Sequence, residues 1–110
     1  MTALTEGTDY EIVGVQRGDV YNEIVIRTIN TVDDADTLAV DMTKYGIQAS
    51  GLMGVVGYAH STANSIVVAE DPTTTVSSGT ITLTVTGSTD DLQRYYVVKD
   101  FAVPNPSSAI

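Results

Sequence analysis

The chain of 110 residues contains no cysteine, no tryptophan and a single histidine, His60. Without a thiol, neither cysteine-based catalysis nor a thiolate metal site is available. A Ser-His-Asp type of site would have to use His60, which stands beside Ser61 without a Gly-x-Ser-x-Gly motif anywhere in the chain. We therefore expect a protein that is not an enzyme, with no catalytic residue and no cofactor.

Basic residues are also scarce. Five Lys and Arg stand against 14 Asp and Glu, which gives a formal net charge of −9. Nucleic-acid binding needs clustered bases to replace the counterions of phosphate, and an anionic membrane surface makes a similar demand. The five bases are scattered along the chain: Arg17, Arg27, Lys44, Arg94 and Lys99. The most apolar run, 51–59, is too short to span a bilayer. We expect neither a nucleic acid nor a membrane as partner.

What the chain does have is alternation of polar and apolar residues. Between Gly79 and Gly87, three aliphatic residues alternate strictly with four threonines. A period of two places Ile81, Leu83 and Val85 on one face of a strand and the threonines on the other. Threonine is β-branched, so both faces favour a strand. This stretch predicts a strand whose apolar face is covered by a second layer.

The rest of the chain predicts about seven strands, at 10–16, 20–30, 37–43, 47–60, 66–70, 80–86 and 92–103. The length of 20–30 indicates a strand with two neighbours or a bend. Lys44-Tyr45-Gly46 predicts one helical turn ended by glycine, and 71–78 predicts a polar loop. Short connections and no long helix are typical of a single antiparallel β-sandwich or small barrel, with an immunoglobulin-like or jelly-roll-like strand order.

The domain organisation follows from the same pattern. Residues 1–8 predict an N-terminal arm and 9–103 the β-domain. Pro104 and Pro106 stop any ladder, because proline donates no backbone N–H, so 104–110 predicts an extended tail. Within 47–60, Gly51, Gly54 and Gly57 indicate a bulge or a close approach of another backbone.

An acidic turn is the one candidate metal site. Asp33, Asp34 and Asp36 lie within four residues and carry the oxygen ligands that calcium takes. Their spacing lacks the full loop of a dedicated calcium site. An acidic turn exposed to solvent is the simpler interpretation, so we assign no metal.

Adjacent tyrosines in the last strand are candidate interface residues. Tyr95 and Tyr96 must point to opposite faces of a strand, and Tyr96 shares its face with Arg94 and Val98. One tyrosine then lies outside the core, where a large apolar ring with a polar tip suits a protein interface.

Four segments carry a resemblance to a known class: DTLAV at 36–40, YGI at 45–47, SGTITLTVTGSTD at 78–90 and YYVV at 95–98. Together they resemble small virion structural proteins of tailed bacteriophages, of the capsid decoration (cement) type. The resemblance implies a compact, non-enzymatic β-domain on the capsid surface of the virion. It also implies the major capsid protein as partner and a homo-oligomer, commonly a trimer. It transfers no functional residues.

Two other classes fit the same chain. A carbohydrate- or receptor-binding β-sandwich, from a tail fibre or an adhesin, would present an exposed aromatic platform or depend on calcium. A tail-tube or neck subunit would form rings or polymers. The tripeptide Arg17-Gly18-Asp19, which some cell-surface receptors read, is interpreted here as a turn between two strands.

Overall fold

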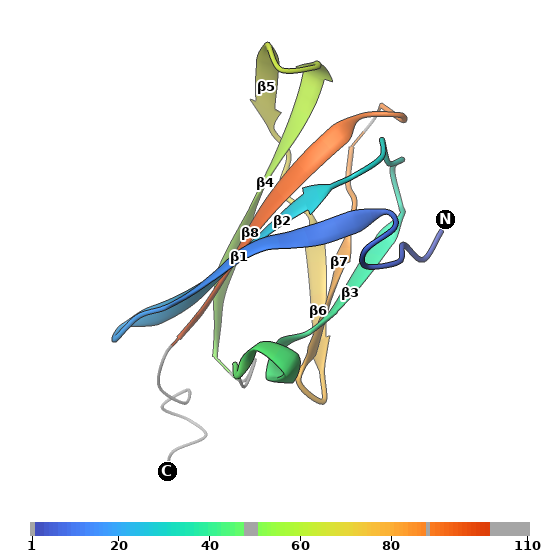
Figure 1. The fold of residues 1–110 in the computed structure, drawn as a ribbon. Coiled ribbons are helices and arrows are strands. Elements are labelled where there is room, and N and C mark those ends of the chain that lie inside the picture. The colour runs from blue at the N-terminus through green and yellow to red at the C-terminus, as the bar shows by residue number, and fades with distance from the viewer. Residues whose placement is uncertain (1, 48–50, 88, 102–110) are drawn as a thin grey trace.

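The computed structural model describes residues 2–47, 51–87 and 89–101 and is all-β. Eight strands form two antiparallel sheets that pack as a sandwich (Figure 1). The strands are β1 (Tyr10–Arg17), β2 (Tyr21–Thr28), β3 (Thr37–Asp41), β4 (Leu52–Thr62), β5 (Ile66–Ala69), β6 (Thr73–Ser77), β7 (Thr80–Thr84) and β8 (Gln93–Phe101). The predicted all-β sandwich is confirmed. No helix within these ranges is long and apolar enough to cross a membrane.

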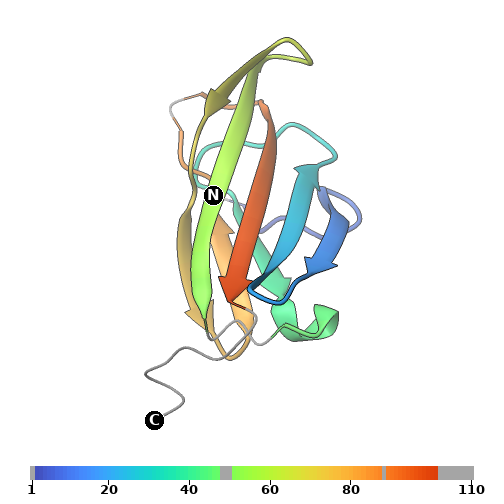
Figure 2. The same ribbon diagram turned by 90° about the vertical axis from the view of Figure 1, so that its left-hand side faces the viewer.

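The two sheets differ in width. The larger has the order β1-β2-β8-β4-β5 and the smaller β3-β7-β6. Figure 2 looks onto the five-stranded sheet, with the three-stranded sheet behind it. Of the two alternatives that its length left open, the structure shows the first: β2 has two neighbours, β1 and β8. Because the larger sheet is wider, part of its apolar surface has no opposing layer.

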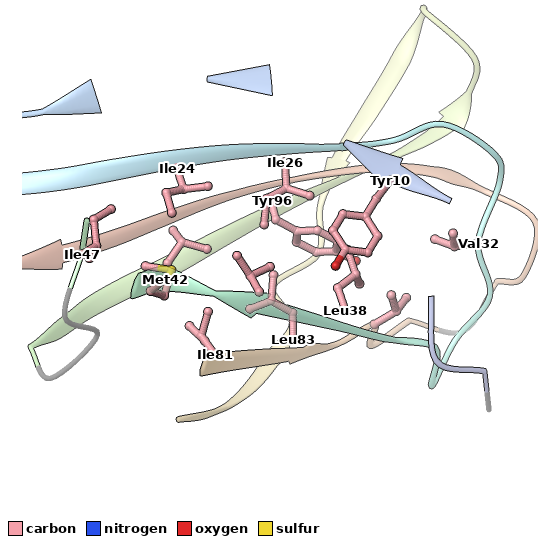
Figure 3. Packing of buried hydrophobic residues seen from close by; sticks show 13 residues of the cluster. Tyr10, Ile24, Ile26, Val32, Leu38, Met42, Ile47, Ile81, Leu83 and Tyr96 are labelled. Carbon is pink, nitrogen blue, oxygen red and sulfur yellow. The ribbon is translucent and has the colours of Figure 1, made fainter. Parts of the chain in front are cut away.

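The core lies between the sheets (Figure 3). The predicted alternation is confirmed, since Ile81 and Leu83 of β7 and Val85, just after the strand, are all buried. The smaller sheet places Leu38 and Val40 of β3 opposite Leu83 and Ile81 in register. The larger sheet completes the core with Ile24, Ile26, Tyr96 and Val98. Burial of this apolar surface is the main favourable term in folding.

Two corrections concern the strands. Residues 73–77, predicted as part of a loop, form the eighth strand, β6, which pairs along its whole length with β7. Its threonines are β-branched and suit a strand, although their polarity indicated a loop. Val15 packs against the core, although strict alternation along 10–16 would put it on the same face as exposed Val13. A bulge between Ile12 and Gly14 shifts the register and reverses the alternation there.

The helical turn is confirmed as a 3-10 turn, η1 (Met42–Tyr45), which starts two residues earlier than predicted. The Asp41 side chain accepts a hydrogen bond from the Thr43 N–H and caps its start. Gly46 ends it with φ of 75° and donates its N–H to the Thr43 carbonyl. A left-handed φ is costly for other residues, which explains glycine at this position.

The N-terminal residues 2–8 lie against their own domain. The Leu4 N–H donates to the Thr37 carbonyl at 2.8 Å, and the Thr37 N–H donates to the Thr2 carbonyl at 2.9 Å. These bonds occupy the free edge of β3 at its first residue, Thr37, and block that position from pairing with another chain. The predicted tail at 104–110 lies outside the described residues.

Two buried tyrosines provide a matched stability test. The Tyr10 hydroxyl donates to the Ala39 carbonyl at 3.0 Å, while the buried Tyr96 hydroxyl has no hydrogen-bond partner among the described residues. Burial raises the pKa of Tyr10 to about 12 and raises that of Tyr96 as well. A satisfied buried hydroxyl contributes about 1 kcal/mol, whereas an unsatisfied one costs a similar amount.

We therefore expect Tyr10→Phe to lower the free energy of unfolding by about 1 kcal/mol and Tyr96→Phe to leave it unchanged or raise it. Urea denaturation of both variants at pH 7 measures the difference. An equal loss in the two variants would contradict the bonding described here.

Candidate functional site

The outer face of the larger sheet, meaning the face turned away from the three-stranded sheet, is the widest exposed surface built from regular strands. Strand pairing arranges its side chains in rows across the strands. The middle row contains Val25, Val97 and Val56 from β2, β8 and β4. Beside it, Tyr95 and Tyr58 lie in register on β8 and β4. Val56 and Tyr58 are 41% and 42% exposed. An apolar row at the centre of a solvent-facing sheet is typical of a protein-binding surface.

Charges flank this apolar centre in opposite-signed pairs. On one side Arg27 pairs with Glu11 in a salt bridge. On the other side Glu23 of β2 lies in register with Lys99 of β8. The Lys99 ammonium also lies 5.1 Å from the ring centroid of Tyr21. Two acids and two bases balance on this face, so the net charge of −9 is carried by the rest of the molecule.

The β4–β5 hairpin, residues 58–69, is a second apolar surface. Figure 1 shows it extending past the other strands at one end of the sandwich. All four residues of β5 are exposed: Ile66, Val67, Val68 and Ala69. Val67 is in register with His60 of the outer face, whereas Val68 is in register with buried Ala59. The hairpin therefore exposes apolar side chains on both of its faces.

β5 is also an edge strand with little of the usual protection. Natural edges carry charges, prolines or bulges that discourage pairing with another chain. Residues 61–69 contain neither charge nor proline, and the one irregularity in the β4–β5 pairing is a register shift between His60 and Thr62. On the side away from β4, the backbone groups of β5 pair with no strand among the described residues. An exposed apolar edge of this kind suits the addition of a strand from another protein.

The three candidate aspartates of the acidic turn accept hydrogen bonds from backbone N–H groups. Asp36 accepts from the N–H of Thr2 at 3.1 Å and from that of Asp33 at 2.9 Å. Asp33 and Asp34 accept from the N–H groups of Asp91 and Gly87, both at 2.9 Å. Their carboxylates thus link the β2–β3 loop to the loop before β8. Across the ranges that the structure describes, no three acidic or histidine side chains gather around a common point that would hold a metal.

A buried arginine holds the same end of the sandwich together. Arg94 is fully buried on the inner face of β8, and its Nε donates to Glu70 Oε1 at 2.5 Å. Its other two nitrogens donate to the carbonyls of Val32 and Thr89. The guanidinium therefore joins three connections: β2–β3, β5–β6 and β7–β8. Its geometry is that of a structural ion pair, with the arginine fully buried and the glutamate partly buried.

A second charged group is buried on the inner face of β8. Asp100 is 2% exposed, and burial raises the pKa of its carboxyl. One of its carboxylate oxygens, Oδ2, has no hydrogen-bond partner among the described residues. The two charges on this face of β8 lie six residues apart in sequence, and neither shares a site with His60.

His60 lies on the outer face beside Tyr95, with ring centroids 4.8 Å apart. Its Nδ1 accepts the N–H of Asn64 in the hairpin turn. The nearby Ser61 hydroxyl bonds the Ile66 carbonyl. The histidine thus takes part in the turn of the β4–β5 hairpin. The Arg17-Gly18-Asp19 tripeptide forms the β1–β2 turn, where Arg17 donates to the Tyr45 carbonyl at 2.7 Å.

The sequence placed the two candidate tyrosines on opposite faces, and the structure shows how they lie. Tyr96 is buried in the core, and Tyr95 is half-buried on the outer face. Neither the β4–β5 hairpin nor the valine row was predicted from sequence as an exposed surface. The run of three apolar residues at 66–68 was the available signal, because a strand covered on one face alone alternates.

Comparisons with models of known protein families, with curated proteins and with solved structures find no match.

Proposed function

We propose that this protein is a non-enzymatic structural component of a tailed-phage particle, a capsid decoration protein that binds the assembled shell. The observation that carries the proposal is the uncharged β4–β5 hairpin, which exposes apolar side chains on both faces and a strand edge. The assignment to a phage particle comes from the sequence resemblance described above. The β-sandwich fits the compact β-domain that this resemblance implies. Its partner is the major capsid protein.

The mode of binding follows from the hairpin. An apolar edge strand gains backbone hydrogen bonds by pairing with a strand or an extended segment, and its side chains gain burial. A protein that binds the assembled shell and not its free subunits stabilises the shell by mass action. The net charge of −9 elsewhere on the molecule discourages self-aggregation and suits a partner surface with basic residues.

A mixing experiment tests the proposal. Expanded capsids of the phage that carries this sequence, stripped of the protein, are incubated with purified wild-type protein or with Val68→Lys. Bound protein is measured by cosedimentation, and shell stability by the temperature at which DNA is released. We expect wild type to bind and to raise the release temperature, and Val68→Lys to bind at least about tenfold more weakly.

The chain offers a matched control in Val76→Lys. Val68 and Val76 are 44% and 43% exposed, and both lie on edge strands in register with a buried residue. Thermal melting should show both variants folded. Loss of binding by Val68→Lys with retention by Val76→Lys supports the hairpin as the binding surface. Wild-type protein that neither binds nor protects the capsids overturns the proposal.

A further inference from the structure

We propose that two copies of this chain form a two-fold symmetric dimer by stacking the outer faces of their five-stranded sheets. The inference goes beyond the capsid-binding role. Its contacts centre on β2, β8 and β4, and it shares with that role only the outer-face side chains of the β4–β5 hairpin. It rests on the order of apolar and charged rows across β2, β8 and β4, which is self-complementary under one two-fold operation.

The rows define the operation. Along β2, Arg27, Val25 and Glu23 point to the outer face in that order, and on β8 they are in register with Tyr95, Val97 and Lys99. A two-fold axis that runs across the strands, along the valine row, places each valine over its counterpart in the second copy. The same rotation exchanges the rows on either side of the valines.

This exchange pairs opposite charges. Arg27 of one copy comes to lie over Glu23 of the second copy, and the contact occurs twice because a two-fold interface is isologous. Lys99 comes to lie over the ring of Tyr95 of the second copy, an arrangement that favours a cation–π contact. An axis along β8 would instead place Lys99 over its own counterpart, with repulsion between the two ammonium groups. The pattern therefore selects one of the two axes.

The charge of the whole molecule points to the same surface. Two copies with a net charge of −9 each repel one another, so they approach at the lowest cost where the surface is locally neutral. On the outer face two acids balance two bases. Stacked sheets normally align within about 30° and pack about 10 Å apart, a separation that the valine row allows.

The area of the outer face indicates how stable the dimer should be. Five strands spaced by about 4.8 Å and about eight residues long at about 3.3 Å per residue cover roughly 600 Å² on each copy. Specific interfaces bury about 800 Å² on each partner, so this one lies at the small end of the range. We expect a reversible equilibrium of monomer and dimer that is visible at micromolar concentrations.

Sedimentation velocity over a concentration series measures the equilibrium directly. The average molecular mass of the wild-type protein should rise from the monomer value of 11.6 kDa toward twice that value as the concentration increases. Val97→Lys should weaken the dimer at least about tenfold, because it buries a charge at the two-fold axis. Val76→Lys, which adds the same charge to the smaller sheet, should leave the dimer unchanged.

A charge exchange tests the predicted axis. In a homodimer of the Arg27→Glu variant, the new glutamate would lie over Glu23 of the second copy. In a homodimer of the Glu23→Arg variant, the new arginine would lie over Arg27. Like charges meet in both cases, so each variant should remain monomeric. A mixture of the two variants should form a heterodimer, since every contact then joins an acid to a base. Melting temperatures of the separate variants confirm that both are folded.

Three outcomes would overturn the inference. They are wild-type protein that stays monomeric at every concentration, a dimer that survives Val97→Lys, and a mixture of the charge variants that forms no heterodimer. A trimer in place of a dimer would contradict it as well. Capsid binding is measured with Val68→Lys, so failure of the dimer and failure of the decoration role are read from different variants.

Discussion

Arg94→Met is expected to lower the free energy of unfolding by about 3 to 5 kcal/mol. The substitution removes a fully buried guanidinium that bonds Glu70, Val32 and Thr89. It leaves the Glu70 carboxylate, whose side chain is 16% exposed, without its ion-pair partner. It also leaves two carbonyls without donors at the end of the sandwich where three connections meet. The loss of a buried partner costs more than the pair contributes, because the remaining groups stay desolvated.

Urea denaturation at pH 7 measures this loss, and Arg94→Lys separates charge from geometry. Lysine keeps the positive charge but lacks the planar fork that reaches three acceptors, so we expect an intermediate loss. Glu70→Gln, which keeps a hydrogen-bond acceptor for the arginine, should also destabilise. A loss below about 1 kcal/mol for Arg94→Met would show that the arginine does not hold these connections together.

Gly57→Ala is expected to cost about 3 kcal/mol through overpacking at the point where the chain passes from β5 to β6. A Cβ at Gly57 would lie 2.2 Å from the Glu70 carbonyl oxygen and 2.9 Å from Cε1 of Tyr96. The Glu70 contact is with backbone, and Glu70 donates its N–H to the Gly57 carbonyl at 2.8 Å. To relieve this clash, the backbone at Glu70, the ion-pair partner of Arg94, would have to shift.

Gly54→Ala is the matched control on the same strand. A Cβ at Gly54 would meet no atom within 4 Å, so the substitution should be neutral or raise stability by about 0.5 kcal/mol. Thermal and urea denaturation of both variants compare the two positions. Equal effects at Gly54 and Gly57 would contradict the close approach of backbone at Gly57.

Local patterns predicted much of the fold because the physical cause is local. Alternation identified β7 and its buried face, and it placed Tyr95 and Tyr96 on opposite sides of β8. Gly46 marked the end of the 3-10 turn through its backbone conformation. The glycines of β4 indicated a bulge or a close approach, and both occur. The register shifts next to Gly54, and Gly57 packs against Glu70.

The features that sequence did not predict depend on distant partners. Strand β6 contains three threonines that indicated a loop, and it is a strand because β7 offers a full set of backbone partners. Val15 faces the core because of a bulge in β1, and the alternation of residues does not predict that bulge. The exposure of β5 depends on the smaller sheet being narrower, which no local pattern reveals.

We propose that this protein acts by binding to a phage particle through its β4–β5 hairpin. Under this proposal the sequence is carried by a phage, and quantitative mass spectrometry of the purified virions tests the proposal most directly. We expect many copies of wild-type protein per particle, in a fixed ratio to the major capsid protein. Particles from a Val68→Lys phage should contain few copies, and those from Val76→Lys the full number. Virions that lack the wild-type protein, or that retain Val68→Lys in full, would contradict the account.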